Sequence, residues 1–548
     1  MSAISFKTLG AMLSAQAGAR ADKPALICRH GQEIHTFGEL EGSARRVAAA
    51  LLALGAARGE NAALWAPNMT AYMGIAFGCA KAGVPLVLVN TNFRTYELEQ
   101  VLRQTEAATL FIADGAGRPG EFPEALGELC PELAGAVAGR VAAARLPYLR
   151  RVVFLGEESR PGMFSWPEFL ALADDADEAL VAAREAAVTA EDVFAILLTS
   201  GTTGTPKGAM LTHANFAYVA AAVGEGLGLT PADRLCIPLP FFHAYGLGMV
   251  MAAVATGAAV APLDRFRAPE LLATIEDCRC TMVFGTPTMF VAALEELASR
   301  EYDLSSLRGG NTAGAFCPPE LATAVIDKLG VREFGVFFGM TESYCTINRP
   351  EDPTGRRIGT IGRAMPGMEI RVVDPRTGRE APAGAAGEFC MRGPAVMKGY
   401  YKMPEATALA IDAEGWLHSG DLAQADAGGY YCITGRIKDM IIRGGENIHP
   451  AEIEEFLFTH PKVADAQVVG VPCDYYGEDV VAFVRLKAGC TATSLELKRY
   501  CRERIALTKV PAKFFFVDRY PLTASGKVRK FRLREMAARL LAADGQKG

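Results

Sequence analysis

The residues best suited to chemistry lie in a loop rich in hydroxyl groups, TSGTTGTPKG, at positions 199–208. Glycines let the backbone turn tightly and bring its N–H groups close to a ligand, and the hydroxyls add further donors. The spacing differs from the common phosphate loop, in which four residues separate the first glycine from a Gly-Lys pair. A flexible surface turn is the alternative, but turns rarely collect so many hydroxyls with a lysine. The loop predicts a polyphosphate site formed by Thr199, Ser200, Gly201, Thr202, Thr203, Gly204 and Lys207.

Other polar residues follow predicted strands further along the chain. His243 comes after an apolar run at 234–240, and Thr341 and Glu342 come after another at 333–338. Ligands of α/β proteins bind at the carboxyl ends of parallel strands, and a carboxylate is a ligand that Mg²⁺ prefers. Taken alone, His243 is more often a buried core residue and Glu342 an ordinary surface carboxylate.

The loop TSGTTGTPKG resembles the phosphate-binding signature of the adenylate-forming superfamily. This superfamily includes acyl-CoA synthetases, aryl-CoA ligases, peptide-synthetase adenylation domains and firefly-type luciferases. Further segments match the family in its order: PFFH at 240–243, NTAGAFCP at 311–318, FGMTE at 338–342, WLHSGD at 416–421, RGGENI at 443–448 and PLTASGKV at 521–528. The matches extend over roughly residues 20–535.

The resemblance implies nucleotide and acyl roles for residues in the larger part of the chain. Thr341 would contact the α-phosphate, Glu342 would hold Mg²⁺, and His243 would line the carboxylate end of the acyl pocket. Residues for the nucleoside are Ala313, Gly314 and Ala315 at the adenine, with Asp421 and Arg436 at the ribose.

The resemblance also implies a mobile lid at the carboxyl end of the chain. Lys438 matches the hinge, and Lys527 matches the catalytic lysine that bridges the acyl oxygen and the phosphate. Gly444, Gly445 and Glu446 match the segment that lines the pantetheine tunnel, whereas the role of Arg443 differs between subfamilies.

The implied reaction has two steps and uses ATP, Mg²⁺ and coenzyme A. A carboxylate attacks ATP to give acyl-AMP and pyrophosphate; the lid then turns, and the CoA thiol displaces AMP. Residues 284–290 and 307–314 resemble medium-chain fatty-acyl-CoA synthetases. Other functions stay open as alternatives: an aryl- or dicarboxylate-CoA ligase, an adenylation enzyme that loads a carrier protein, and a luciferase-like oxygenase. If the substrate is a dicarboxylate, Arg265 or Arg267 could supply the cation that pairs with its second carboxylate.

The elements that must position these residues alternate between helix and strand. Residues 30–112 and 281–343 alternate in this way, which favours parallel α/β sheets, and residues 369–432 predict a β-rich subdomain of short strands. After a boundary at 435/436, a helix beginning at Pro450 and strands at 465–470, 480–487 and 513–517 predict a small α+β lid. Two domains are therefore predicted. Residues 1–435 form the domain that binds AMP and the acyl group, and residues 436–548 form the mobile lid that carries the catalytic lysine.

Composition excludes several classes of protein. The chain has 548 residues, a formal net charge of −6 and 50% hydrophobic residues, so a folded protein without a nucleic-acid partner is expected. Thirteen scattered cysteines favour reduced thiols and a cytoplasmic location. The most apolar stretch, 247–263, contains Gly and Pro and predicts no transmembrane segment. Peripheral membrane contact and homodimer formation stay open.

Overall fold

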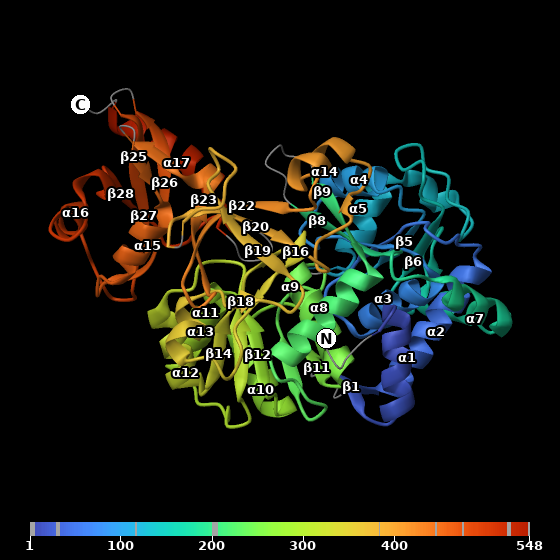
Figure 1. The fold of residues 1–548 in the computed structure, drawn as a ribbon. Helices are drawn as coiled ribbons and strands as arrows, with labels where there is room; N and C mark the ends of the chain where they lie inside the picture. The colour runs from blue at the N-terminus through green and yellow to red at the C-terminus, as the bar shows by residue number, and fades with distance from the viewer. Residues whose placement is uncertain are drawn as a thin grey trace.

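The computed structural model describes residues 6–28, 33–115, 118–199, 206–382, 384–443, 446–473, 476–522 and 528–545 (Figure 1). In Figure 1 the elements up to β23 form the larger body, and the orange-to-red segment that ends in α17 lies at one end of it. None of the described helices is long and apolar enough to cross a membrane.

One mostly parallel sheet has the strand order β14-β13-β12-β10-β11-β1-β2, in which only the β1–β2 pair is antiparallel. Its strands are β1 (Pro24–Cys28), β2 (Glu33–Thr36), β10 (Arg234–Ile237), β11 (Ala259–Pro262), β12 (Met282–Gly285), β13 (Gly309–Thr312) and β14 (Glu333–Val336). The strand predicted at 234–240 ends at Ile237, because Pro238 and Pro240 have no N–H to donate to a neighbouring strand.

A second sheet has the order β21-β9-β8-β4-β3-β5-β6-β7. Its strands are β3 (Ala62–Trp65), β4 (Leu86–Leu88), β5 (Thr109–Ile112), β6 (Arg151–Phe154), β7 (Phe164–Ser165), β8 (Val193–Thr199), β9 (Lys207–Thr212) and β21 (Gly399–Tyr400). The apolar run predicted as a buried strand is β8, and its neighbour β4 runs parallel to it. The hydroxyl-rich loop connects β8 to the antiparallel strand β9.

Alternate residues of the second sheet enter two different cores. Leu64 of β3 belongs to a large core shared with the first sheet, whereas Ala63 and Trp65 belong to a smaller one on the opposite face. Helices of the large core are α1 (Leu9–Arg20), α2 (Phe37–Ala53), α3 (Thr70–Ala82), α8 (His213–Gly226) and α9 (Ala244–Thr256). The smaller core includes residues of α4 (Thr95–Gln104) and α5 (Glu121–Leu129). Both faces are covered, as parallel sheets require.

The remaining helices of the body connect and cover these sheets. They are α6 (Trp166–Ala171), α7 (Glu178–Ala187), α10 (Ala268–Cys278), α11 (Pro287–Leu297), α12 (Pro319–Leu329), α13 (Thr354–Gly359) and α14 (Pro404–Ala410).

The β-rich subdomain contains an antiparallel sheet in the order β19-β20-β22-β23. Its strands are β19 (Glu369–Val373), β20 (Gly387–Arg392), β22 (Leu417–Ala425) and β23 (Tyr431–Arg436). Two short antiparallel strand pairs precede it, formed by β15 (Gly339–Met340) with β16 (Ser343–Tyr344) and by β17 (Thr346–Ile347) with β18 (Arg363–Ala364).

The C-terminal unit is the predicted α+β arrangement. Its elements after the 3₁₀ turn η2 (Ile437–Asp439) are β24 (Ile441–Arg443), β25 (Glu446–Ile448), α15 (Pro450–Phe458), β26 (Val463–Cys473), β27 (Gly477–Leu486), α16 (Ser494–Arg502), η3 (Leu507–Lys509), β28 (Lys513–Phe516) and α17 (Lys530–Gly545). Adjacent residues Val468 and Val469 of β26 enter cores on opposite faces of the sheet. The predicted strands and the helix start at Pro450 are confirmed.

Candidate functional site

Four neighbouring strands of the first sheet bring chemistry-bearing residues to one edge. His243 follows β10, Thr286 follows β12, Ala313 follows β13, and Glu342 follows β14. These strands are parallel, so their carboxyl ends open on the same side of the sheet. The residues predicted at the acyl group (His243), the adenine (Ala313) and the metal (Glu342) therefore share an edge, although they lie far apart in the sequence.

Glu342 is a buried carboxylate at the turn between β15 and β16. It is 7% exposed, and the hydroxyl of Tyr400 donates a hydrogen bond to its Oε1 at 2.7 Å. Burial and the neighbouring carboxylate raise the pKa of Tyr400, so its hydroxyl stays a donor. Thr341, beside Glu342 on the same turn, is half-buried. A single carboxylate oxygen with a fixed neighbour suits a magnesium ion whose other ligands are phosphates.

Tyr400 also connects Glu342 to the phosphate loop. It lies on β21 opposite Ala209 of β9, and the ammonium of Lys207 lies 4.9 Å from the centroid of its ring. Lys207 is itself paired with Thr199 across β8 and β9. One aromatic ring therefore holds the carboxylate through its hydroxyl and the lysine through its face.

The other predicted loop residues, Ser200, Gly201, Thr202, Thr203 and Gly204, lie outside the described residues. Tyr400 is a site residue that the sequence analysis missed. Glu342 is 58 residues away in the chain, and the GYY segment at 399–401 offered only an aromatic cluster as a signal.

Asp421 and Arg436 meet across the antiparallel strands β22 and β23. They are directly opposite each other, and Nε of Arg436 donates to Oδ1 of Asp421 at 2.7 Å. The charge of Asp421 raises the pKa of Arg436, and Glu342 adds a smaller contribution. The Asp421 side chain is 5% exposed and the Arg436 side chain 63%. The predicted ribose pair is therefore assembled, with its cation at the surface.

The predicted adenine segment continues directly from β13. Ala313 is buried, Gly314 is half-buried with φ of 89°, and Ala315 is exposed. A positive φ of this size favours glycine, so the chain turns sharply where a flat base would approach the backbone. The preceding Asn311 is buried, and its carbonyl accepts a hydrogen bond of 2.9 Å from the hydroxyl of Tyr245.

His243 lies at the N-cap of α9. Its half-buried imidazole contacts the ring of Phe242, with 4.7 Å between ring centroids. From Gly246 to Thr256 the helix is buried and carries no charged side chain. Arg265 and Arg267 are exposed, and Arg267 pairs with Glu270 on α10. Both arginines therefore lie at the surface of the body.

The lid residues are only partly described. Lys438 belongs to η2, and Glu446 begins β25, but their side chains are outside the described set. Gly444, Gly445 and Lys527 also lie outside it. On either side of the lysine loop, Leu522 and Val528 form an antiparallel bridge, and Lys530 pairs with Glu454 of α15 at 2.7 Å. The residues that flank Lys527 are therefore joined to each other and, through Lys530, to α15.

Arg443, whose role the sequence left open, makes structural contacts. Its Nη1 donates to the carbonyl of Thr508 at 2.7 Å, and its Nε lies 2.9 Å from Oδ1 of Asp479. The guanidinium also lies 4.9 Å from the centroid of the Tyr476 ring. It therefore connects β24, β27 and η3 within the C-terminal unit.

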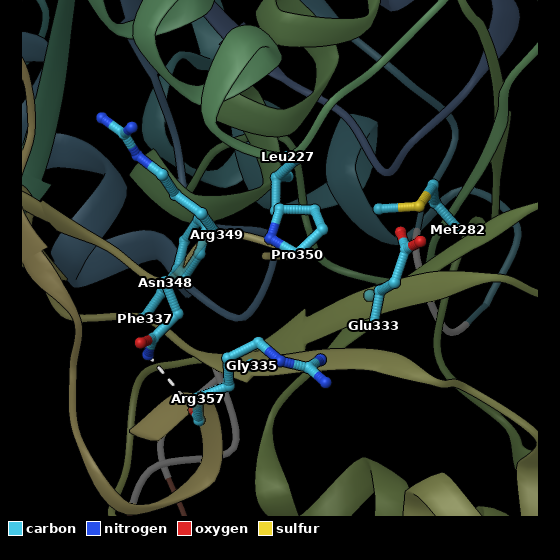
Figure 2. A pocket seen from close by; sticks show the side chains of 10 residues that line it. Leu227, Met282, Glu333, Gly335, Phe337, Asn348, Arg349, Pro350 and Arg357 are labelled. Atoms are coloured by element: carbon cyan, nitrogen blue, oxygen red, sulfur yellow. Dashed lines mark hydrogen bonds between the residues drawn. The ribbon is translucent and has the colours of Figure 1, made fainter. Parts of the chain in front are cut away.

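A small cavity lies beside β14, and none of the predicted site residues lines it (Figure 2). Its volume is about 10 Å³, near the lower limit for a single water molecule. Met282, Gly310, Glu333 and Arg357 contribute to the lining. This cavity is too small for any substrate of the predicted reaction.

Comparison with known families decides the identity of this arrangement. The model of the AMP-binding enzyme family matches residues 13–401, and the model of the AMP-binding enzyme C-terminal domain matches residues 452–527. The chain belongs to the AMP-binding enzyme family. It is an AMP-forming ligase with ATP-dependent acyl-CoA synthetase activity, and members of this class use a carboxylic acid, ATP and CoA.

Two relatives match nearly the whole chain. A putative acyl-CoA synthetase, YngI of Bacillus subtilis, is 42% identical over 98% of both chains. A mitochondrial medium-chain acyl-CoA ligase, ACSF2 of Danio rerio, is 38% identical over 95% of this chain and 86% of its own. The membership predicted from the motifs is therefore confirmed.

Two solved structures have the same fold. ATP-bound MatB from Rhodopseudomonas palustris has a TM-score of 0.82 and 28% identity, covering 96% of this chain and 99% of its own. The anthranilate CoA ligase AuaEII, in complex with anthranoyl-AMP, has a TM-score of 0.84 and 28% identity, covering 98% of each. The predicted mixed α/β fold, with a large N-terminal and a smaller C-terminal domain, is confirmed, whereas the boundary at 435/436 stays a prediction.

Proposed function

We propose that this AMP-binding family member activates fatty acids, of the medium-chain type, as their CoA thioesters. The observation that carries this proposal is the apolar, charge-free helix α9 directly after His243. A hydrocarbon chain can be buried against such a helix without leaving a charge unpaired. The relatives named medium-chain acyl-CoA ligase support the same substrate class.

The specific roles of the site residues belong to this proposal. Thr341 and the loop Thr199–Lys207 contact the phosphates, Asp421 and Arg436 hold the ribose, and Ala313, Gly314 and Ala315 contact the adenine. Preorganised donors and cations of this kind stabilise the charge that develops as two anions react. Lys527 then binds the acyl carboxylate and the α-phosphate together, so that the acid attacks in line.

Glu342 fits the position of a Mg²⁺ ligand. Its carboxylate is buried and fixed by Tyr400, and Lys207 of the phosphate-binding strand lies against the same ring. When bound, Mg²⁺ would neutralise charge on the phosphates. We expect Glu342→Gln, which keeps shape but removes charge, to lower adenylation about 100-fold and to raise the Mg²⁺ concentration needed for half-maximal rate.

The exposed Glu351 offers a matched control for this substitution. Glu351→Gln should leave the rate and the Mg²⁺ dependence unchanged. An unaltered Mg²⁺ dependence in Glu342→Gln would contradict the role of Glu342 as a metal ligand.

We further propose that the lid alternates between the two half-reactions. Rotation about Lys438 removes Lys527 after adenylation and brings Gly444, Gly445 and Glu446 to the path of the pantetheine arm. One mobile domain can then serve two different transition states.

Substrate profiling tests the fatty-acid assignment. CoA-dependent release of AMP should be measured with short, medium and long straight-chain acids, with benzoate and anthranilate, and with malonate. The highest kcat/KM is expected for a medium-length chain. The anthranilate ligase among the structural relatives makes an aryl acid the second candidate, and a higher kcat/KM for anthranilate or malonate would overturn the fatty-acid proposal.

A carrier protein, in place of CoA, is the alternative acceptor of the acyl group. Pyrophosphate exchange that requires the acid, without any CoA-dependent turnover, would favour an enzyme that loads a carrier.

A further inference from the structure

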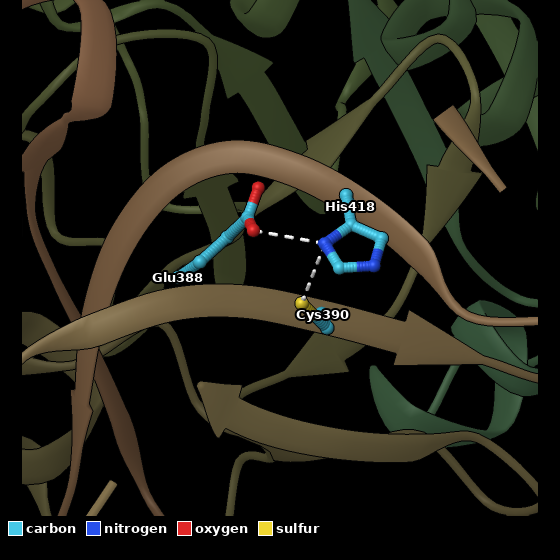
Figure 3. A group of neighbouring side chains, drawn as sticks. All are labelled: Glu388, Cys390 and His418. Carbon is cyan, nitrogen blue, oxygen red and sulfur yellow. Dashed lines mark hydrogen bonds and ion pairs between the residues drawn. The ribbon is translucent and has the colours of Figure 1, made fainter. Parts of the chain in front are cut away.

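Three potential metal ligands share one face of the antiparallel sheet, outside the proposed catalytic roles. Glu388 and Cys390 are two residues apart on β20, and His418 of β22 is directly opposite Cys390 (Figure 3). Residues two apart on a strand face the same side, so all three side chains converge. Their ligand atoms lie within 4.8 Å of one another, and no other such group occurs among the residues that the structure describes.

The distances are close to those of a tetrahedral zinc site. Nδ1 of His418 lies 2.8 Å from Oε2 of Glu388 and 3.4 Å from Sγ of Cys390. Zinc bonds of about 2.0–2.3 Å place ligand atoms roughly 3.3–3.6 Å apart in a tetrahedron. The sulfur–nitrogen separation already has this value, and Glu388 would withdraw by about half an ångström to admit the ion.

A second carboxylate orients the imidazole from its other side. Oδ2 of Asp412 lies 3.5 Å from Nε2 of His418. Asp412 is itself fixed, because its Oδ1 accepts hydrogen bonds from the backbone N–H groups of Trp416 at 2.8 Å and Glu414 at 3.0 Å. Histidine ligands of metals typically donate their outer N–H to a carboxylate in this way, which leaves the inner nitrogen to bind the ion.

We propose that Glu388, Cys390 and His418 form a binding site for Zn²⁺ or a similar borderline divalent cation. A sulfur, a nitrogen and an oxygen donor together favour zinc over the hard ion Mg²⁺. On binding, the thiol proton of Cys390 leaves to solvent, and water completes the fourth position. The site does not depend on which acid the enzyme activates.

The proposed metal site is connected to the nucleotide site through Glu388. Its other oxygen, Oε1, accepts a hydrogen bond of 3.1 Å from the N–H of Gly420, which directly precedes Asp421. Gly420 has φ of 71° and lies within β22, where the register with β20 is irregular, directly before Asp421. A bound ion would therefore restrain this part of β22, and we expect it to raise the melting temperature of the protein without nucleotide.

Cobalt titration of the full chain tests the proposal. After removal of metal with a chelator, the protein is titrated with Co²⁺ in excess Mg²⁺ and without nucleotide. Mg²⁺ then occupies sites made of oxygen ligands, and these sites do not add to the measured binding of Co²⁺. One equivalent should bind with a thiolate-to-cobalt charge-transfer band, and Zn²⁺ should displace it. Cys390→Ser should remove the band, and His418→Gln should weaken binding at least tenfold.

Two further variants distinguish this site from other thiols. Cys432, a half-buried cysteine on β23 of the same sheet, supplies the matched control, and Cys432→Ser should retain the band. Asp412→Asn should keep the band but weaken binding about 10- to 100-fold, because Asp412 orients a ligand without binding the ion.

Absence of stoichiometric binding to the folded wild-type protein would overturn the proposal. A band that persists in Cys390→Ser would do the same, since it would place the thiolate elsewhere. If Cys390→Ser does not fold, the Asp412→Asn titration decides, and an affinity equal to that of the wild type would refute the site.

Discussion

The interior of the large body and its contact with the C-terminal unit differ in how firmly charged residues are held. In the body, Glu342 and Asp421 are buried and each has a fixed hydrogen-bond partner. In contrast, an ion pair between the two parts, Arg485 with Glu295, has an N–O distance of 3.9 Å, and the Glu295 side chain is 68% exposed. Exposed pairs of this kind contribute about 0–1 kcal/mol. This weak contact between the two parts agrees with the proposal that the C-terminal unit changes position relative to the body.

This difference predicts that removing Lys527 affects only one half-reaction. Lys527→Ala should lower formation of acyl-AMP about 1,000-fold, because the proposed role of Lys527 is to place a cation in the charged transition state. Thioester formation from supplied acyl-AMP should stay within about threefold of wild type, because in the proposed cycle the lid has by then moved the lysine away. Rapid-quench assays of each half-reaction give the two rates.

Lys487, an exposed lysine in the same unit, offers a matched control for that experiment. Lys487→Ala should leave both half-reactions unchanged. Equal loss of both steps in Lys527→Ala would show that the lysine does not act only in adenylation.

A residue of the body should instead affect both half-reactions. Asp421 is proposed to hold the ribose of ATP and of acyl-AMP alike, so Asp421→Asn should raise the KM for both about tenfold or more. The same two assays measure this effect. A loss confined to adenylation would remove the distinction between a binding body and a mobile lid.

Arg443 should matter for the stability of the C-terminal unit and not for CoA binding. Arg443→Lys loses the forked contacts to the Thr508 carbonyl and Asp479, which should cost about 1–3 kcal/mol in the free energy of unfolding. Chemical denaturation monitors the loss, and the KM for CoA should not change below the unfolding transition. A raised KM for CoA in a fully folded variant would indicate a direct contact with the cofactor.

The last prediction concerns the pH dependence of stability at a histidine of the body. Burial lowers the pKa of His213 to about 4, although the charge of Asp192 opposes the shift. Its unfolded pKa is near 6.5, so protons favour the unfolded state. Stability should be full above about pH 6.5 and fall by up to about 1.4 kcal/mol per unit as the pH decreases toward 4.

Thermal melting of His213→Gln from pH 7 to pH 4.5 checks this dependence, which should be weaker than in the wild type. His35→Gln, at a partly exposed histidine, should follow the wild-type curve. Parallel curves for all three proteins would assign the pH dependence to other groups.

The sequence predicted elements whose signals are local. The apolar run before the loop became β8, and Pro450 begins α15. The motifs predicted a ribose role for Asp421 and Arg436, which stays a prediction. They did not predict the direct pairing of the two residues, because the register of β22 and β23 depends on the whole sheet. In the same way, Tyr400 meets Glu342 only because β21 joins the edge of the second sheet at β9.

The direct pairing of Asp421 with Arg436 has a consequence for inhibitor design. Arg436 is followed at once by η2, so the chain leaves the body beside the ribose pair. If the proposed ribose site and the proposed hinge at Lys438 are correct, a compound that bound this pair and extended along η2 would join the nucleotide site to the pivot. We expect such a compound to hold the enzyme in one domain arrangement without occupying the acyl pocket.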